Sequence, residues 1–486
     1  MKPPYEQIEK ELQASKQELQ AAKQELHDTK QELQRANDEI EKLKALLKVA
    51  FDRIAELEKQ IGRNSKNSSK PPSTDQKGNT SENKQKQNRQ AHAGKARALY
   101  PSERVNHHVQ CTRETCPYCN SEQLHQLQEV PAVWQQVELP EVQAVVTQFN
   151  CQKYCCEECG QNSVGELPEG VPYSAFGPKL MALIATLTGR FHLAKRETMQ
   201  LLSDLYGIEL SVGSIINIEE NVANALDEIY EKIHRCVVEG TLPRYFDETS
   251  WRDSGKRHYV WTATTKLAAY YKIDPRRSQE AFFKVIGTHT SQPSVSDRYN
   301  AYNALDGPHQ YCLAHLIRDF HAFAEEPGEN GQIGGKIEQE LRKACGIHAE
   351  WRDGKLSKKQ MKQCLAHSKR RLDNLFTDAI AFASEALATL CERLGEEYER
   401  LWAFTLVDGM EPTNNLAERD LRKLVLWRKK SYGTRSPRGQ RFVERITSVV
   451  ETLKKNTTNV LYFLEEAVRA FYKGSPSPSI AYKMGI

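Results

Sequence analysis

The sequence predicts a multidomain α/β protein: an N-terminal coiled coil, a small zinc ribbon, and an α/β core that contains an all-helical insertion. Three observations support this prediction. Hydrophobic residues recur every seven positions through the first part of the chain, pairs of cysteines follow, and strand-like segments in the middle of the chain end near acidic residues. A chain of 486 residues is also too long for one hydrophobic core, so several domains are expected.

Composition argues against a membrane protein. No stretch approaches the length of about 18 apolar residues that a membrane-spanning helix needs. The first residues run directly into a charged segment and lack the apolar core of a signal peptide, so a cytoplasmic location without membrane attachment is expected. The formal net charge is only +4, but basic residues gather in particular segments, and this clustering is the more informative feature.

Residues 1–61 are predicted to form a coiled coil and, through it, a homo-oligomer. From position 5 to 61 the chain contains no Pro or Gly, and one hydrophobic residue recurs every seven positions, namely Leu12, Leu19, Leu26, Leu33, Ile40, Leu47, Ile54 and Ile61. Small residues such as Ala22 and Ala36 occupy many of the positions three residues after these, which form the second row of the heptad seam. The number and direction of the helices stay open, and a single amphipathic helix is the alternative.

Residues 62–100 differ sharply in composition and are predicted to be a disordered basic linker. Between Gly62 and Arg97 there are nine Lys or Arg residues against two acidic ones, with almost no apolar residues. The linker is either a plain spacer or a non-specific contact to phosphate groups.

Residues 101–170 are predicted to form a zinc ribbon, because seven of the twelve cysteines lie between positions 111 and 159 in a chain that has no secretion signal. Strand-like runs at 132–138 and 142–149 lie between two C-x-x-C turns. Cys155 is an alternative to its neighbour in the second turn, and Cys111 and Cys151 are spare. A structural Zn²⁺ bound by four thiolates is expected, with Cys116, Cys119, Cys156 and Cys159 as ligands.

Residues 171–240 are expected to be helical. The pattern predicts helices at 179–187, 195–205 and 211–233, and Ser211 is a suitable N-cap for the last of them. The second and third helices are compatible with a DNA-binding helix-turn-helix, and ordinary helical packing is the alternative.

The next segments are predicted to form an α/β core in two parts, 241–320 and 411–442, with a helical insertion at 321–410. Strands are expected at 242–248, 258–264 and 268–273, followed by a helix at 279–286, a strand that ends at Asp297 and a strand at 310–312. This is the order of elements in an RNase H-like core. Helices are expected at 362–376 and 379–394 in the insertion, and at 445–454 and 460–472 in a C-terminal part, 443–486.

Three acidic residues on separate elements are the candidate catalytic centre: Asp247, Asp297 and Glu418. Such a set can hold two Mg²⁺ or Mn²⁺ ions for phosphoryl transfer, with Asp247 bridging the ions and each of the other two completing one metal site. The chain offers 64 acidic residues, so the choice is weak by itself. Glu248, Asp306 and Glu444 are the alternatives.

The segment that follows Pro412 is the candidate nucleic-acid surface. Between Arg419 and Arg441 there are nine Lys or Arg residues and one acidic residue, and aromatic side chains are interleaved with them. A helix is expected to begin near position 412, and Gly433, Pro437 and Gly439 predict a loop after it. A simple solvated face is the alternative to DNA contacts, which are predicted for Asn414, Asn415, Arg419, Arg422, Lys423, Arg428, Lys429, Lys430, Arg435 and Arg438.

Several motifs of the sequence are specific in combination. They are the coiled coil, the two cysteine turns, and the phrases Arg63–Ser73, Asp247-Glu248-Thr249, Asp297-x-Tyr299-x-x-Tyr302, Cys312-x-x-His315-x-x-Arg318 and Asn414-Asn415-x-x-Glu418-Arg419-x-x-Arg422. With them the chain resembles the IS66 family of insertion-sequence transposases, in their large subunit, nearly from end to end. Arg298 departs from the family pattern, in which a Gly is more usual.

The resemblance implies a DNA transposase. An RNase H-like domain would cut the terminal inverted repeats of a mobile element and join the freed 3′-hydroxyl to target DNA, with Asp247, Asp297 and Glu418 as its acidic triad. The implied partners are DNA and small companion proteins of the same element, and the implied location is the nucleoid when DNA is bound. The alternative is a non-catalytic, domesticated DNA-binding regulator built from the coiled coil and the zinc ribbon.

Overall fold

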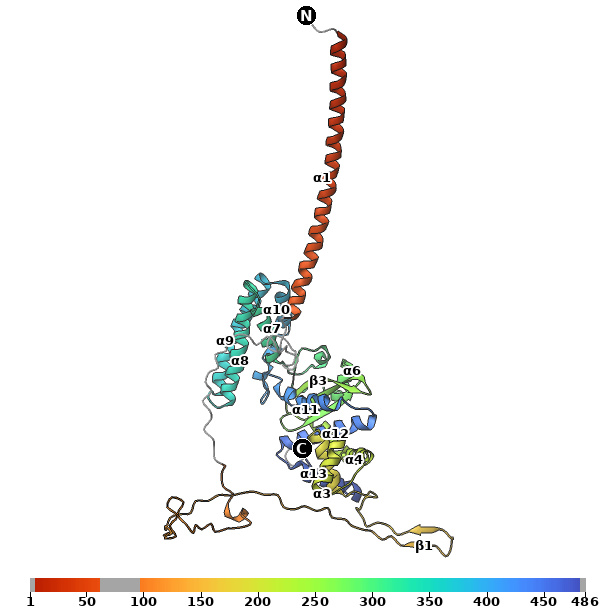
Figure 1. The fold of residues 1–486 in the computed structure, drawn as a ribbon, viewed down its shortest axis with the longest axis vertical. Helices are drawn as coiled ribbons and strands as arrows, with labels where there is room; N and C mark the ends of the chain where they lie inside the picture. Colours follow the sequence, from red (N-terminus) through yellow and green to blue (C-terminus); the bar gives the residue numbers. More distant parts are fainter. Residues whose placement is uncertain (1–4, 62–96, 481–486) are drawn as a thin grey trace. The chain divides into compact units, whose positions relative to one another are not determined.

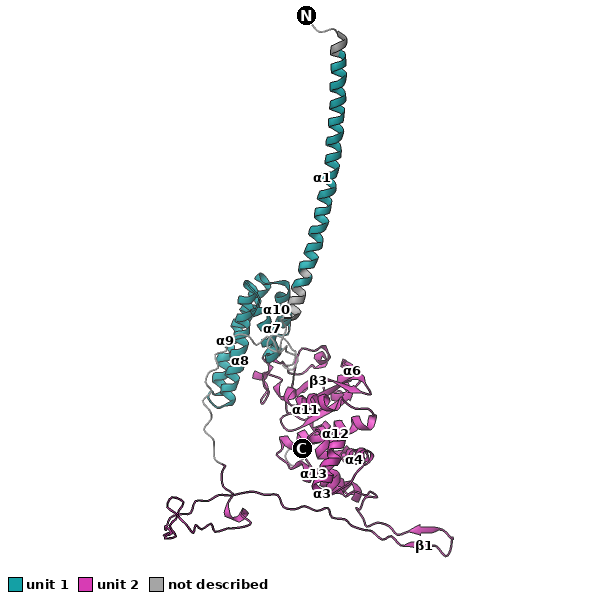
Figure 2. Cartoon of the chain, in the orientation of Figure 1, with its two compact units in different colours: residues 1–77, 313–401 teal, residues 78–312, 402–486 magenta. Residues whose placement is uncertain are grey.

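The computed structural model describes residues 5–61 and 97–480, coloured along the sequence in Figure 1. The chain divides into two compact units, one comprising residues 1–77 and 313–401 and the other residues 78–312 and 402–486 (Figure 2). The second unit contains the sheet and the first is helical, which confirms the prediction of a multidomain α/β protein. Among the described residues, no helix combines the length and apolar character needed to cross a membrane.

The first unit begins with α1, a single helix of 57 residues that runs from Tyr5 to Ile61. The helix prediction for this segment is therefore confirmed. The heptad residues from Leu12 to Ile54 are all exposed, with exposed fractions between 47% at Ile40 and 62% at Leu33. The predicted basic linker lies almost wholly outside the described residues.

The helical insertion of the first unit contains α7 (Leu313–Ala324), α8 (Glu329–Arg352), α9 (Lys358–Phe382) and α10 (Glu385–Glu396). The insertion begins earlier than predicted. The predicted break between 376 and 379 is wrong, because α9 continues to Phe382 and the next helix begins only where Ser384 accepts a capping hydrogen bond from the amide of Leu387.

The second unit begins with the cysteine-rich segment, where a short 3₁₀ helix (Ser102–Arg104) precedes an antiparallel pair of strands, β1 (Lys153–Cys155) and β2 (Asn162–Val164). Residues 132–138 and 142–149 form no strand, which contradicts the sequence prediction. Their alternating pattern satisfies the propensity for a strand, but a strand also requires a hydrogen-bonding neighbour, and these residues pair with none in the described part of the chain.

Four helices follow: α2 (Pro178–Ala185), α3 (Lys195–Tyr206), α4 (Val212–Ala225) and α5 (Asp227–Glu239), with a π-helical turn at Thr186–Arg190 after the first. The predicted helix at 211–233 is in fact two helices that meet at Leu226. Helix α3 ends at Gly207, whose φ of +62° allows a left-handed cap, and α4 begins at Ser211, which accepts from the amide of Ser214. Helices α3 and α4 are thus joined by a short turn that is capped at both ends.

The sheet of this unit has five strands in the order β5-β4-β3-β6-β7: β3 (Arg244–Asp253), β4 (Lys256–Thr264), β5 (Ala269–Asp274), β6 (Ser294–Ser296) and β7 (His309–Tyr311). The first three strands are antiparallel, whereas β6 and β7 run parallel to β3. Helix α6 (Gln279–Ile286) connects the two halves with the predicted bounds.

The first strand of the sheet is longer than predicted. It continues beyond position 248 to Asp253 and turns through Ser254 and Gly255, both with positive φ, into β4. Asp247 therefore lies inside a long strand rather than at its end. The reason is that β4 extends along the whole of β3, whereas β6 pairs with its first residues only.

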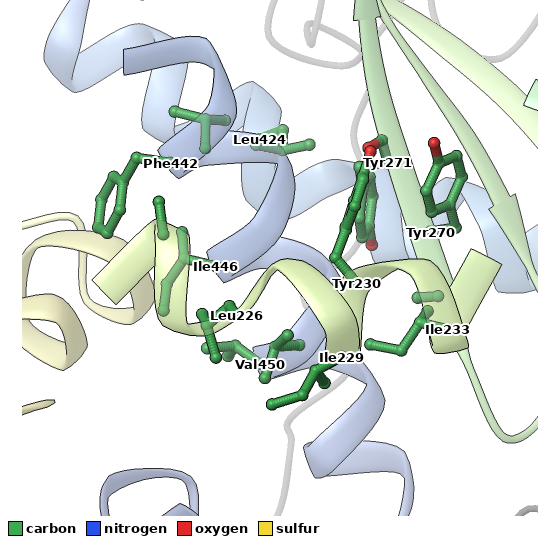
Figure 3. Close-up of a cluster of buried hydrophobic side chains, with 14 of the residues drawn as sticks. Leu226, Ile229, Tyr230, Ile233, Tyr270, Tyr271, Leu424, Phe442, Ile446 and Val450 are labelled. Carbon is green, nitrogen blue, oxygen red and sulfur yellow. The ribbon is translucent and has the colours of Figure 1, made fainter. Parts of the chain in front are cut away.

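Three C-terminal helices complete the unit: α11 (Asn415–Ser431), α12 (Pro437–Lys455) and α13 (Val460–Lys473). The predicted loop is thus confined to residues 432–436. Figure 3 shows the core that α5, α11 and α12 form with β5, in which Tyr230, Tyr271, Leu424, Ile446 and Val450 lie together.

Helix α12 also covers the edge of the sheet that β5 forms. Its Glu444, Ser448 and Thr452 lie four residues apart and accept hydrogen bonds from alternate backbone amides of β5, at 2.7, 3.1 and 3.0 Å. An edge strand that presents unpaired amides is prone to aggregation, and these side chains satisfy the amides.

Candidate active site and basic surface

Two of the three predicted acidic residues come from neighbouring parts of the central sheet, Asp247 from within β3 and Asp297 from the residue after β6. Strands β3 and β6 are parallel, with Tyr245 opposite Val295. Continuing this register by two residues places Asp247 opposite Asp297, which is the first residue after β6. Residues in register on neighbouring strands point to the same face of the sheet, so this register would bring the two carboxylates to one face.

A buried arginine fixes this pairing. Arg244 at the start of β3 is fully buried, and its guanidinium donates to the carbonyls of His289 and Gln292 and to the hydroxyl of Ser294, at 2.8, 3.3 and 3.1 Å. These bonds hold the segment that leads into β6 against β3. No local sequence pattern points to a role for Arg244, because its partners lie 45 to 50 residues away along the chain.

Helix α11 brings Glu418 to the same strand. The side-chain amide of Asn414, the N-cap residue of α11, donates to the carbonyl of Phe246 at 2.6 Å, directly before Asp247. Glu418 lies one turn further along, and its own amide donates to the carbonyl of Asn414 at 3.2 Å. Positions four apart lie on the same helix face, so Glu418 lies on the side of the helix that Asn414 anchors to β3.

The electrostatics of Asp247 reflect the other acidic residues near it. Burial raises the pKa of Asp247 well above its ordinary range, and the neighbouring carboxylates of Glu248, Asp297 and Glu418 raise it further. Burial and the Glu248 carboxylate also raise the pKa of Asp297, to about 6. Clustered carboxylates are typical of a site that binds a cation, because a divalent ion relieves their repulsion.

Of the three alternative acidic residues, Glu248 already has a cationic partner. Its side chain is 2% exposed and forms an ion pair with Arg277, whose Nε donates to one carboxylate oxygen at 2.8 Å, while the hydroxyl of Tyr302 donates to the other. Arg277 also lies 4.0 Å above the ring of Tyr299. The amide of Tyr299 donates to Asp297 at 2.9 Å, so this network supports the turn that carries Asp297. No pattern in the sequence points to Arg277 as the partner of Glu248.

The remaining two alternatives lie outside the acidic cluster. Glu444 is buried on α12 and binds the amide of Ile273 at 2.7 Å and the ammonium of Lys272 at 3.4 Å. Asp306 is exposed on the loop before β7. Glu248 and Glu444 thus have partners of their own and Asp306 lies on an exposed loop, which leaves Asp247, Asp297 and Glu418 as the candidate residues.

The predicted DNA-contacting residues separate into two groups. Asn414 is buried, and Arg428 is half-buried and donates to the carbonyl of Ser250 and to Thr249 Oγ1, so both residues hold α11 along β3. Arg438 is also half-buried and forms an ion pair with Glu220 at 3.0 Å. The others are exposed on α11 and the following loop: Asn415, Arg419, Arg422, Lys423, Lys429, Lys430 and Arg435.

The loop after α11 is attached to the end of the β3–β4 hairpin. Thr434 forms a parallel bridge with Asp253 and accepts a hydrogen bond from the indole of Trp251 at 3.1 Å. Gly433 has a φ of +96°, and a Cβ atom there would lie 2.0 Å from the carbonyl oxygen of Arg252. Only glycine permits this close approach. The hairpin that carries Asp247 thereby also positions the basic loop.

The two C-x-x-C segments fold into matching turns. In each turn the backbone amide of the first cysteine donates a hydrogen bond to the carbonyl of the residue five positions later. The carbonyl of the same cysteine accepts one from the amide of the residue four positions later, and all four bonds are 2.9 Å long. The residue after the second cysteine, Asn120 or Gly160, has positive φ. This correspondence aligns Cys156 with Cys116, whereas the Cys155 thiol donates to two carbonyls of its own turn.

Both turns favour thiolates. Hydrogen bonds from the backbone amides of Tyr118 and Cys119, in this order of effect, lower the pKa of the Cys116 thiol. The pKa of the Cys156 thiol is lowered mainly by the backbone amide of Cys159. A lowered thiol pKa favours the form that binds zinc. Within the described residues, no three of the four predicted ligands lie close enough to share one ion, and the two turns remain separate.

Comparison with known families gives two matches. A model described as the transposase IS66 family matches residues 173–441, which is more than half of the chain. A model described as a family of unknown function matches residues 1–101, which contain α1 and the predicted linker. A search of curated proteins finds no match.

Proposed function

The chain belongs to the IS66 family of transposases, and we propose that it cuts the DNA ends of an insertion sequence and joins them to target DNA with an Asp-Asp-Glu centre. The observation that carries this proposal is the proximity of Asp247 on β3 to Asp297, the residue after β6, and to Glu418 on α11. We further propose that the sheet is an RNase H-like core, since three antiparallel strands followed by two parallel ones in the order β5-β4-β3-β6-β7 support this assignment.

We propose that Asp247 contributes to both of two Mg²⁺ or Mn²⁺ sites, while Asp297 and Glu418 each complete one of them. Such ions, when bound, activate the attacking oxygen and stabilise the leaving oxygen of a phosphodiester. The chain's own residues supply the geometry: Arg244 holds the segment before β6 beside β3, and Asn414 holds the start of α11 there. The raised pKa values of Asp247 and Asp297, caused by burial and then by neighbouring carboxylates, support a cation site, because a divalent ion would stabilise the charged carboxylates.

DNA is the proposed partner of the basic surface. The seven exposed residues of α11 and its loop include six cations and extend away from Glu418 on the same helix, which supports a path for the DNA backbone toward the acidic centre. The α3–α4 pair is a second proposed contact, because its capped turn has the form of a helix-turn-helix.

The N-terminal parts are proposed to assemble and stiffen the protein. The exposed heptad leucines of α1 support pairing with further copies of the chain, since eleven large hydrophobic residues of this helix are exposed. The matching cysteine turns support a structural Zn²⁺ bound by Cys116, Cys119, Cys156 and Cys159.

The test of the catalytic proposal is metal-dependent cleavage of DNA that carries the native flanks of the gene. The wild-type protein should produce nicks at the flanks with Mg²⁺ or Mn²⁺, and Asp247→Asn should produce none while still binding the DNA. Asp306→Asn is the matched control, because Asp306 is an exposed acid outside the cluster. Cleavage by Asp247→Asn would refute the triad, and tight binding without cleavage by the wild type would favour a non-catalytic regulator.

A further inference from the structure

A cavity of about 430 Å³ lies in the second unit, apart from the acidic cluster. Its walls come from three places in the sequence: the segment between the π-helical turn and α3, the middle of α4, and the stretch from the end of α11 to the start of α12. Its volume lies in the range of ligand-binding pockets. Lys430 and Arg435 of the proposed DNA surface line this cavity, and α3 and α4 contribute to its walls, but the functions proposed above give the cavity itself no role.

One wall of the cavity is an aromatic stack. The rings of His192 and Trp427 lie 4.6 Å apart with an angle of 13° between their planes, and both residues line the cavity. His192 has a φ of +55°, an uncommon conformation for a residue with a side chain, and it follows the π-helical turn at Thr186–Arg190. Irregular helical turns and such backbone conformations concentrate at functional sites.

The ring of His192 is uncharged at neutral pH. Burial lowers the pKa of this histidine to about 4, and the nearby ammonium groups of Lys430, Lys423 and Lys454 contribute to the shift. An uncharged imidazole stacks on another aromatic ring without bringing a charge into the apolar part of the cavity. That part is completed by Leu193, Ile216 and Phe442.

The rim of the cavity is basic. Lys195, Lys430, Arg435 and Arg438 line it, together with two carboxylates, Glu219 and Glu220. The carboxylates form ion pairs with Lys195 and Arg438, whereas Lys430 and Arg435 have no ion-pair partner among the residues that the structure describes. Four cations against two anions leave an excess of positive charge at the rim.

We propose that this cavity holds one unstacked nucleotide of a DNA strand, with its base continuing the His192–Trp427 stack and its phosphate between Lys430 and Arg435. The combination of an aromatic wall and a basic rim matches a nucleotide, which has a flat apolar ring and an anion at opposite ends. An inorganic anion would leave the aromatic wall unused. The inference rests on the proposed function, because it requires that the chain binds DNA.

The test compares the affinities of the full-length chain for single-stranded and duplex DNA in the presence of a metal chelator, by fluorescence anisotropy. The single-stranded probe is a labelled oligothymidylate of about eight nucleotides, a length typical of single-strand binding sites. Replacing His192 with Ala should weaken binding of this probe about ten-fold, as expected from the loss of one stacked base, and should leave duplex binding nearly unchanged. His192→Phe should retain the wild-type affinity, because phenylalanine also stacks.

The control variant is Phe191→Ala. Phe191 is adjacent in sequence and 56% exposed but does not line the cavity, so its replacement should leave both affinities unchanged. Thermal unfolding of each variant checks that the fold is intact. The inference would be overturned if His192→Ala lost affinity equally for the single-stranded and the duplex probe. It would also be overturned if the wild-type chain bound an abasic strand as tightly as oligothymidylate.

The source of the nucleotide and the proposed function are tested separately. If free thymidine monophosphate displaces the labelled strand at concentrations equal to those of the strand, the occupant of the cavity is a free nucleotide. The proposal that the nucleotide belongs to a DNA strand would then be wrong. If the wild-type chain binds neither duplex nor single-stranded DNA, the proposed function itself fails. Duplex binding without any effect of His192→Ala refutes the cavity assignment alone.

Discussion

Replacing Asp297 with Asn should stabilise the metal-free protein at neutral pH while abolishing cleavage. Burial and the Glu248 carboxylate raise the pKa of Asp297 to about 6, against an ordinary value of 3.8. A carboxyl group whose pKa is higher in the folded chain binds its proton more tightly there than in the unfolded chain. Its contribution to stability is therefore fully present below about pH 4 and is lost as the pH rises through about 6.

The size of the effect follows from the two pKa values. Their difference corresponds to a loss of at most about 3 kcal/mol between about pH 4 and neutral pH, and solvent screening of this partly buried group reduces the loss. Asn carries no charge, so Asp297→Asn should avoid the loss and be more stable than the wild type by about 1–3 kcal/mol at neutral pH. The variant keeps its backbone contact, because an amide oxygen can still accept from the amide of Tyr299.

The assay is urea unfolding of the full chain with a chelator present, followed by tryptophan fluorescence at several pH values. Trp251 and Trp261 are buried in β3 and β4, so their emission reports on the sheet that carries Asp297. Mg²⁺ should then stabilise the wild type more than the variant, and Asp306→Asn should behave as the wild type. A variant that is less stable than the wild type at neutral pH, with unchanged pH dependence, would refute the reasoning.

Three other predictions concern separate parts of the chain. Replacing Cys116 with Ser should remove the zinc, about one ion per chain in the wild type by elemental analysis, and Cys155→Ser should not; equal zinc contents in the two variants would contradict the ligand assignment. Replacing Leu26 and Leu33 together with Lys should lower the molar mass in solution by light scattering, because charges enter the heptad seam; an unchanged mass would argue against the coiled coil. Gly433→Ala should destabilise the second unit by about 1–3 kcal/mol, since the new Cβ would meet a carbonyl oxygen of β3; an unaltered urea midpoint would contradict the predicted strain.

Local patterns in the sequence were sufficient for many elements. The heptad repeat predicts α1, and the bounds expected for the helix at 279–286 agree with those of α6. These features depend on residues within one or two turns of each other, so periodicity and capping residues determine them. The three acidic residues were also chosen from the sequence, with motif resemblance as the deciding argument.

Elements whose bounds depend on distant partners were predicted less well. The first strand of the sheet continues to Asp253 because β4 pairs along its whole length, and residues 142–149 form no strand despite their alternation. The helix expected at 211–233 divides at Leu226, although no Gly or Pro marks the break. A sequence pattern records the propensity of a segment and not the position of its neighbours.

The sequence by itself determined which chemical groups this protein offers: three acidic residues, paired cysteines, a heptad seam and a basic stretch. Only the tertiary structure decided what each group does. Glu248 forms an ion pair with Arg277, and Asn414 and Arg428 attach α11 to β3. Cys156, rather than Cys155, occupies the position in its turn that Cys116 occupies in the other. The physical reason is that charge, hydrogen bonding and burial depend on atoms brought together by folding, and the partners of Asn414 and Arg428 lie more than 160 residues away in the chain.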